Sequence, residues 1–388
     1  MRGAELFAGC GGLAMGLSRI GVEHAAMVEW DADAVATVEH NKKRQIGHVA
    51  KWPIEKKDIR TVDWKPFCGT LDLISGGPPC QPFGIGGKKL GHEDERDMWP
   101  EAVRAIREAC PDVFVFENVR NLASPTFRPY LDWVIACLRR PDAERRQDES
   151  HAEHLARLTA MRRPRAYDVI WQVVNAADYG APQIRHRVII QGLSRAFGVP
   201  PEPLTPTHSR DRLLWDQFVT GEYWKRHGIT APTTPDDSRD EARIAALKKL
   251  KEPPALKAWV TLRDAIQGLG EPNGKGNHTH QPGARTYPGH TGSPLDLPSK
   301  ALKAGDHGVP GGENMIRFAD DTVRYLTLRE AARLVGLPDD FEFTRSWTES
   351  MRQLGNAVPA KLAEEIGRHV KAQLNDARAR QAASIAAE

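Results

Sequence analysis

The residues best suited to chemistry form one stiff turn, Gly76-Gly77-Pro78-Pro79-Cys80-Gln81-Pro82-Phe83. The apolar run before it, residues 71–75, predicts a buried parallel strand, so we expect Cys80 at the carboxyl end of that strand, where open α/β sheets bind ligands. The two prolines fix φ and restrict the residue before each of them. A thiol held on such a turn is a candidate nucleophile. A buried structural cysteine is the alternative, and this stretch alone leaves both interpretations open.

A carboxyl group is expected at the same sheet edge. Residues 112–116 are continuously apolar and predict a buried strand, which ends in Glu117-Asn118-Val119. A carboxyl at this position can act as a proton donor, which makes Glu117 a candidate catalytic acid. The alternative is a helix N-cap, which suits Asn118 better than Glu117.

Two guanidinium groups follow in Gln183-Ile184-Arg185-His186-Arg187, between strands predicted at 167–176 and 186–192. Strand alternation predicts that Arg185 and Arg187 point to the same face. Two guanidinium groups on one face suit a phosphate or a carbonyl oxygen. The alternative is a pair of surface arginines without a role.

The N-terminal segment predicts a site for a nucleotide-like ligand. A short strand at 2–8 leads into Gly9-Cys10-Gly11-Gly12 and a helix at 13–20, an order that brings backbone N–H groups and a helix N-terminus to a ligand. The spacing G-x-G-G differs from the dinucleotide pattern G-x-G-x-x-G, so a simple tight turn is the alternative.

A second strand, 24–28, ends in Glu29-Trp30-Asp31. Glu29 lies about where an acidic residue commonly binds ribose hydroxyls, Trp30 could stack on a base, and Asp31 is a candidate N-cap for a helix at 32–41. Asp58-Ile59 ends a weaker third strand and could meet an exocyclic amine; a turn residue is the alternative.

The elements that position these residues alternate as strand and helix up to about residue 193, which predicts an α/β fold. The glycine- and charge-rich segment 84–96 suggests a lid. Residues 139–165 hold eight arginines and five acids and predict a solvated helical insertion; a basic binding face is the alternative. Beyond residue 194 we expect helices at 213–227, 240–251, 325–337 and 360–374. The last dozen residues are expected to fray.

Residues 270–314 are rich in loops, with basic and aromatic side chains between glycines, and are the best candidate for a nucleic-acid-reading surface. The net charge of the 388-residue chain is only +3, so a polyanion must meet a local basic patch. No carboxylate or cysteine shares the spacing of the four histidines of this region, and we predict no metal site.

The five cysteines show no C-x-x-C pair, which favours a reducing compartment. No apolar run approaches 18 residues, and the N-terminus lacks a signal-peptide pattern. We therefore expect a cytoplasmic protein that contacts no membrane.

Six segments together resemble the DNA (cytosine-5)-methyltransferase family, in the family's order. They are Glu5-Leu-Phe-Ala-Gly-Cys-Gly-Gly12, Gly77-Pro-Pro-Cys-Gln-Pro-Phe83, Glu117-Asn-Val119, Gln183-Ile-Arg-His-Arg187, Leu328-Arg-Glu-Ala-Ala-Arg-Leu334 and Gln353-Leu-Gly-Asn-Ala-Val-Pro359. The resemblance implies a Rossmann-like S-adenosylmethionine-dependent fold with a mixed, mostly parallel sheet. The catalytic domain would span 1–193 and be completed by 349–388. A smaller, loop-rich target-recognition domain would span 194–348, with DNA between the two.

The resemblance also implies the chemistry. Cys80 would add to C6 of a cytosine flipped out of duplex DNA, and Glu117 would act on the N3 side. Arg185 would bind the O2 carbonyl, and Arg187 would position Glu117 or the backbone. S-adenosylmethionine, with S-adenosylhomocysteine as product, would be held by Phe7, Gly9, Cys10, Gly11, Gly12, Glu29, Trp30, Asp58, Ile59, Pro79, Met98 and Asn356. We expect DNA contacts from Gln81, Lys88, Lys89, Gln183, Arg285 and His290.

The partners implied are double-stranded DNA and a cognate restriction endonuclease that acts on the same site, and we expect a monomer. Gly84 and Gly86 stand where the family often has serine, which leaves Cys80 intact but puts a lid hydroxyl contact to DNA in doubt. A tRNA methyltransferase is one alternative, although its Cys-Phe-Thr element is missing here. A catalytically silent DNA-binding protein is the other.

Overall fold

The computed structural model describes residues 1–79, 97–288, 290–304 and 314–387. They divide into two compact units. The first unit contains Met1–Val174, His186–Leu204 and Ala363–Glu388, and the second contains Asn175–Arg185 and Thr205–Leu362. Compared with the expected domains, residues 175–185 and 349–362 fall in the second unit, and residues 194–204 fall in the first.

The first unit is built on a seven-stranded sheet with the order β3-β2-β1-β4-β5-β8-β6. Strand β1 lies parallel to β2 and β4, and β4 lies parallel to β5, whereas β8 runs antiparallel to β5. The mixed, mostly parallel sheet predicted from the sequence is confirmed. The strands are β1 (Arg2–Leu6), β2 (Glu23–Glu29), β3 (Ile54–Lys56), β4 (Leu73–Gly76), β5 (Val113–Val119), β6 (Tyr167–Asn175) and β8 (His186–Ser194).

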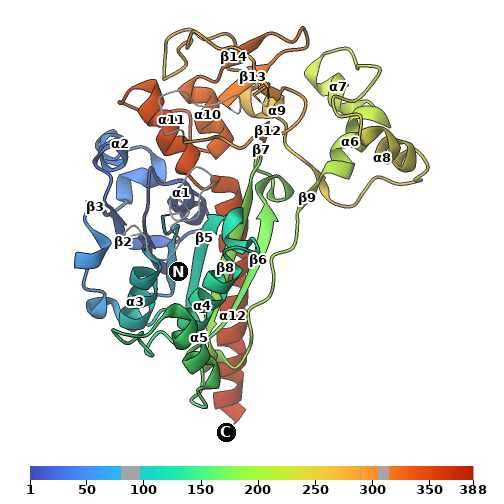
Figure 1. Cartoon of the computed structure of the whole chain (residues 1–388). Helices are drawn as coiled ribbons and strands as arrows, with labels where there is room; N and C mark the ends of the chain where they lie inside the picture. Colours follow the sequence, from blue (N-terminus) through green and yellow to red (C-terminus); the bar gives the residue numbers. More distant parts are fainter. Residues whose placement is uncertain (80–96, 289, 305–313, 388) are drawn as a thin grey trace. The chain divides into compact units, whose positions relative to one another are not determined.

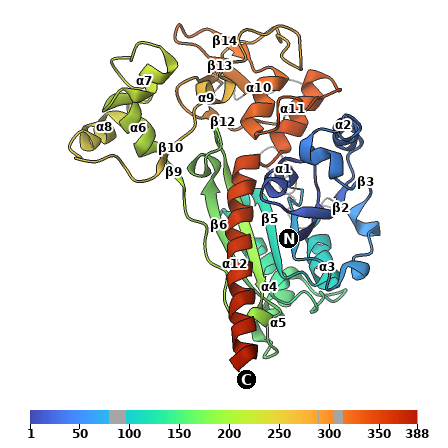
Figure 2. The ribbon, with the colours of Figure 1, turned by 180° about the vertical axis from the view of Figure 1, so that it is seen from behind.

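Helices cover both faces of this sheet. Helices α3, α4 and α5 lie on one face (Figure 1), and the long α12 runs along the other (Figure 2). The buried side chains of α3 and α4 pack with Phe114 and Phe116 of β5 in one hydrophobic core. The helices of this unit are α1 (Gly12–Arg19), α2 (Ala32–Lys43), α3 (Trp99–Ala109), α4 (Arg128–Arg139), α5 (His151–Ala160) and α12 (Ala360–Ala387).

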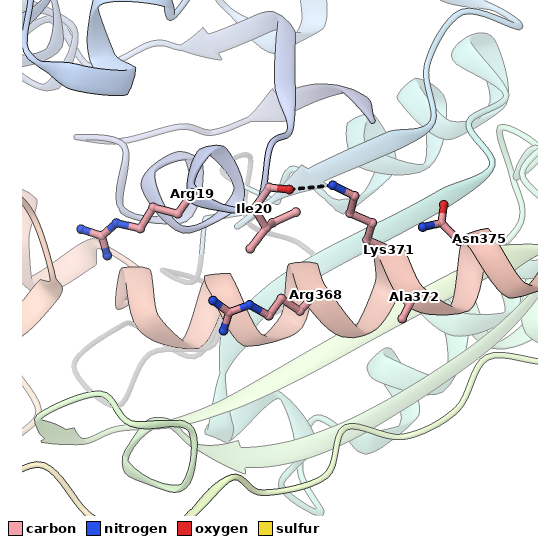
Figure 3. Close-up of a pocket in the computed structure, with 6 residues that line it drawn as sticks. All are labelled: Arg19, Ile20, Arg368, Lys371, Ala372 and Asn375. Atoms are coloured by element: carbon pink, nitrogen blue, oxygen red, sulfur yellow. Dashed lines mark hydrogen bonds between the residues drawn. The ribbon is translucent and has the colours of Figure 1, made fainter.

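Helix α12 packs directly against the end of α1 (Figure 3). The Lys371 ammonium donates to the Ile20 carbonyl at 2.8 Å. A Cβ added at Gly367 would lie 2.9 Å from Leu17 Cδ2, so this glycine permits the close approach of the two helices. The C-terminal segment thereby completes the first unit, and its helix continues to Ala387 although fraying was expected.

The insertion at 139–165 contains one short helix. Ser150 and Glu153 form a capping box at the start of α5, and buried Leu158 joins the core. The Trp133 indole of α4 donates to His154 Nδ1 at 3.1 Å. The insertion is thus docked on α4 through one face.

The second unit consists of small sheets and short helices. Its strands are β7 (Gln183–Ile184), β9 (His208–Ser209), β10 (Lys257–Ala258), β11 (Ser293–Pro294), β12 (Ser299–Lys300), β13 (Met315–Arg317) and β14 (Val323–Tyr325). Its helices are α6 (Arg210–Phe218), α7 (Glu222–His227), α8 (Asp240–Leu247), α9 (Leu262–Ile266), α10 (Leu328–Val335) and α11 (Trp347–Asn356). The single helix expected at 213–227 is divided, because Gly221 takes a left-handed φ of 71°.

Short 3-10 turns connect these elements at Gly47–Lys51, Ile59–Thr61, Lys65–Phe67, Arg120–Ala123, Ala176–Tyr179 and Arg195–Phe197. In the described part of the chain, none of the helices combines the length and the apolar character needed to span a bilayer.

Candidate active site

The turn after β4 is shaped by two glycines. A Cβ at Gly76 would lie 2.5 Å from the Leu6 carbonyl oxygen of β1, and one at Gly77 would lie 3.3 Å from Glu117 Oε2. The turn therefore passes close to β1 and to the Glu117 carboxylate. The description of this segment ends at Pro79, so Cys80, Gln81, Lys88, Lys89 and the expected lid at 84–96 lie outside the described residues.

Glu117 forms an ion pair with Arg187. The carboxylate lies near the end of β5, is only 8% exposed, and meets Arg187 Nε of the antiparallel neighbour β8. Arg187 also donates from Nη1 to the His186 carbonyl at 2.8 Å. A charge-assisted contact of this kind fixes the orientation of the carboxyl group.

Asn118 connects β5 to the turn after β4. It lies inside β5, and its amide donates to the Pro78 carbonyl at 3.0 Å. The N-cap interpretation of Asn118 is wrong, since the following 3-10 turn starts after Val119. The bond holds the backbone two residues before Cys80.

Arg185 and Arg187 serve different parts of the molecule. Arg185 is 2% exposed and donates to the Leu302 carbonyl at 3.0 Å and the Gly355 carbonyl at 2.7 Å, both within the second unit. The expected shared face is wrong, because the chain leaves one sheet at Ile184 and enters another at His186. The buried bonds of Arg185 argue against a direct contact with a substrate carbonyl.

The loop after β1 is strongly curved and open on one side. Phe7, Gly9 and Gly11 have φ values of 58°, 55° and 88°. Space around a Cβ at Gly9 is free to 4 Å among the described residues, whereas a Cβ at Gly11 would lie 2.3 Å from the buried Trp52 ring. Successive backbone N–H groups in such a loop form a concave binding surface.

The Glu29 carboxylate organises this loop. It accepts hydrogen bonds from the backbone N–H groups of Gly9, Trp30 and Asp31 at 2.7, 2.9 and 2.7 Å. Burial raises the pKa of Glu29 above its ordinary value. A carboxylate has about four acceptor positions, so one is left for a ligand hydroxyl. The Trp30 side chain is 68% exposed and so is accessible for stacking.

Other residues expected at the cofactor have defined places. Asp31 caps α2 through the N–H groups of Asp33 and Ala34, as predicted. Asp58 caps a 3-10 turn and pairs with Arg60 through both carboxylate oxygens, while Ile59 is buried. The carboxylate of Asp58 is therefore already engaged.

Four further residues expected to bind the cofactor differ in burial and in position. Burial raises the pKa of the Cys10 thiol to about 12, so Cys10 contributes packing and backbone rather than a reactive sulfur. Met98 is half-buried and directly precedes α3. Gly12 begins α1. Asn356 is exposed at the end of α11, in the second unit.

Glu5 is a site residue that the sequence reasoning missed. It lies in β1, is 1% exposed, and accepts from the Ala14 N–H of α1 at 3.2 Å. The N-cap of α1 is Gly11, which has no side chain, so Glu5 supplies the cap. Burial raises the pKa of Glu5 to about 8. An acid in an otherwise apolar strand was the available signal.

The expected DNA-reading residues fall into two groups. Gln183 is 1% exposed and donates to the Leu334 carbonyl at 2.9 Å, which argues against a base contact. Arg285 is exposed, and His290 packs its ring on Tyr287 at 4.3 Å. In the described ranges, no three His, Cys, Asp or Glu side chains are placed to bind a metal ion.

Comparison with known proteins gives consistent matches over nearly the whole chain. The family model for C-5 cytosine-specific DNA methylase matches residues 1–141 and 145–372. The Type II methyltransferase M.NgoMIV of Neisseria gonorrhoeae is 29% identical over 94% of this chain and 96% of its own length. M.AplI of Arthrospira platensis is 28% identical over 96% of this chain and 86% of its own length.

Solved structures show the same fold. A protein described as a DNA modification methyltransferase from an E. coli prophage superimposes with a TM-score of 0.58 at 20% identity, covering 97% of this chain and 99% of that chain. The Entamoeba histolytica methyltransferase EhMeth superimposes with a TM-score of 0.56 at 14% identity, covering 96% and 98%.

Proposed function

Because the chain belongs to the family of C-5 cytosine-specific DNA methylases, we propose that this DNA (cytosine-5)-methyltransferase acts through a covalent bond between Cys80 and the cytosine ring. The methyl acceptor is C5 of a cytosine flipped out of a specific duplex DNA sequence. The relatives are named Type II methyltransferases, which supports a role as the modification enzyme beside a restriction endonuclease for the same site.

One observation carries the catalytic assignment. The Glu117–Arg187 pair lies beside Gly77, and Asn118 holds the carbonyl of Pro78, on the turn that leads to Cys80. A carboxyl group, a guanidinium and the turn that bears the thiol thus meet at the carboxyl edge of one sheet. This is the arrangement that acid-assisted nucleophilic addition requires.

The thiolate of Cys80 adds to C6, and the electron pair of the C5–C6 double bond moves to C5. Glu117 donates a proton or a hydrogen bond on the N3 side and stabilises the charge that builds there. After methylation the C5 proton leaves to water, the C6–S bond breaks, and the thiolate is released. Flipping the base costs a few kcal/mol, which contacts to the extrahelical base must offset.

Arg187 is better placed than Arg185 to act at the pyrimidine. Arg187 is paired with the carboxylate that acts on the ring, whereas the donors of Arg185 are bound to two buried carbonyls. We therefore assign the O2 contact and the positioning of Glu117 to Arg187. Arg185 then holds the chain where it passes between two sheets.

The N-terminal loop fits S-adenosylmethionine. The spare acceptor position of Glu29 suits a ribose hydroxyl, exposed Trp30 suits an adenine face, and the open backbone at Gly9 leaves room for a ligand. When bound, the cofactor supplies an electrophilic methyl group. Glu5 and Glu29 hold the loop in shape by accepting backbone N–H groups at both of its ends.

A mechanism-based trap tests the covalent step. Duplex DNA in which 5-fluorocytosine replaces cytosine is incubated with the protein and S-adenosylmethionine. Because fluorine at C5 cannot leave as a proton does, the wild type should form a denaturant-resistant adduct. Cys80→Ser should form none, and the matched control Cys68→Ser, at an exposed free cysteine, should react like the wild type.

A folded wild-type protein that never forms the adduct would refute the covalent step. Bisulfite sequencing of host DNA after expression should identify the modified site. If tRNA accepts the methyl group and DNA does not, the protein is a tRNA methyltransferase. Binding of DNA without any methyl transfer would indicate a DNA-binding protein without catalytic activity.

A further inference from the structure

The lysines that follow α8 differ from the other cations of their region. Between residues 205 and 247 every arginine and lysine is ion-paired: Arg210, Arg212, Arg226, Arg239 and Arg243 with aspartates, and Lys225 with Glu222. These pairs join α6 to α8 and α7 to Asp264 of α9. Their positive charge is neutralised within the protein.

The next ten residues reverse this pattern. Lys248, Lys249, Lys251 and Lys257 are all exposed, and in the described part of the chain their ammonium groups have no ion-pair or hydrogen-bond partner. Glu252 is the single acid among residues 248–257. The segment therefore presents a concentrated positive charge to solvent in a chain whose net charge is only +3. We call these four residues the lysine surface.

The lysine surface rests on an ordered support. Ile244 and Leu247 of α8 are buried against Leu214 and Trp215 of α6. The far end is fixed as well, since Lys257 N–H donates to the Thr207 carbonyl at 3.1 Å and β10 pairs with β9. Because the backbone is held at both ends, the ordering cost on binding comes mainly from the lysine side chains.

Exposed apolar groups lie among the lysines. Leu250 is 49% exposed and Leu256 is 38% exposed. Lysine suits contacts with single phosphates, as a compact point charge, whereas arginine is favoured for bidentate pairs such as those inside this unit. Favourable charge at the C-terminal end of α8 explains Lys248 and Lys249 alone, but it does not reach Lys251 or Lys257.

We propose that the lysine surface binds the sugar–phosphate backbone of duplex DNA. This inference rests on the proposed DNA substrate. Unpaired ammonium groups displace the counterions condensed on DNA, which gives affinity without reading sequence. The two leucines would lie against deoxyribose.

The test replaces all four lysines, as Lys248→Gln, Lys249→Gln, Lys251→Gln and Lys257→Gln in one variant. Affinity for a labelled mixed-sequence duplex of about 40 base pairs is measured between about 50 and 200 mM salt, where counterion release governs binding. The matched control carries Lys43→Gln, Lys51→Gln, Lys56→Gln and Lys65→Gln, which remove the same charge from exposed sites of the first unit.

For the lysine-surface variant we expect the slope of log K against log salt to fall by about 0.9 for each DNA phosphate that the variant no longer neutralises, or roughly 2–4 in all. Affinity for this duplex should fall at least tenfold at low salt, while the melting temperature should change little. The control variant should keep most of the slope. Equal slopes for wild type and variant, or an equal decrease in the control, would overturn the proposal.

Binding is read without methyl transfer, so this result is independent of the proposed reaction. A surface that docks an acidic protein instead would leave the DNA slope unchanged and so would also overturn the proposal. If the trap with 5-fluorocytosine fails but the slope still falls, the reaction is wrong and the lysine surface stands.

Discussion

The two arginines of the Gln183–Arg187 segment differ in what their loss would do. Arg185→Met removes charge-assisted bonds from two buried carbonyls, which should lower the free energy of unfolding by about 2–4 kcal/mol. Molecules that remain folded should methylate at nearly the wild-type rate. Arg187→Gln should instead lower kcat about 100-fold or more, because it frees the Glu117 carboxyl.

Urea denaturation and single-turnover methylation, both at low temperature, separate these effects. The reverse pattern, with a stable but inactive Arg185 variant and an active Arg187 variant, would return the O2 contact to Arg185.

Two glycines of the cofactor loop form a matched pair. Both have positive φ, so alanine at either costs about 1–2 kcal/mol of backbone strain. Gly11→Ala also forces a Cβ into the Trp52 ring at 2.3 Å, whereas Gly9→Ala meets open space. We expect Gly11→Ala to be clearly less stable than Gly9→Ala in thermal unfolding. Equal melting temperatures would contradict the packing of Trp52 against this loop.

At the scale of elements, the sequence predicts the central sheet well because each strand is a short apolar run bounded by glycines or charges. Strands β1, β2, β5 and β8 lie within two or three residues of their expected positions at one end or both. The sequence does not reveal where the chain leaves one sheet and pairs with a strand of another. The switch between sheets at Arg185 and the role of Asn118 depend on neighbours that are remote in the chain.

In the candidate site, too, the contacts between residues that are remote in the chain could not be predicted from the sequence. Motif spacing predicts that Glu117 and Arg187 matter, but only the antiparallel pairing of β5 with β8 makes Arg187 its partner. Glu5 escaped notice because helix capping is usually sought in the residue before the helix, and here the cap comes from a strand.

Strand β1 carries a pH dependence that can be measured. Burial raises the pKa of Glu5 from 4.5 to about 8, so between these values the native state binds more protons than the unfolded chain. The stability from neutral Glu5 is complete below pH 4.5 and is lost as pH rises through 8. This contribution to the free energy of unfolding is at most about 5 kcal/mol, at about 1.36 kcal/mol for each unit of pKa difference.

Glu5→Gln keeps an acceptor for Ala14 N–H but does not titrate, so the decline between pH 6.5 and 8.5 should largely disappear. Urea denaturation across this window measures it. The neighbouring His24, whose pKa burial lowers to about 4, loses its stabilising effect only as pH falls below about 6.5. Parallel pH profiles for wild type and variant would show that Glu5 is ionised in the folded protein.

At the scale of the whole molecule, the chain assembles each unit from separated segments. The first unit takes three segments, and its last one begins at Ala363. Within it Leu374 and Ala377 are buried, and Arg378 pairs with Asp72 and Asp112 beside β4 and β5. The strands beside the turn that leads to Cys80 are therefore covered only when the C-terminal helix is in place.

Deletion of residues 363–388 should expose the apolar surface of α1 and the sheet, and yield a protein that binds hydrophobic dye and no longer binds S-adenosylhomocysteine. A separate peptide covering 357–388, expressed together with the truncated chain, should abolish dye binding and restore binding of S-adenosylhomocysteine, because helix and sheet recognise each other by packing.

Arg378→Gln alone should lower the free energy of unfolding by only about 1 kcal/mol, since that ion pair is half-exposed. Ile385→Ser, at a side chain that is 69% exposed, should change nothing. A truncated chain that folds cooperatively and binds the cofactor product would mean that the sheet holds its shape without α12.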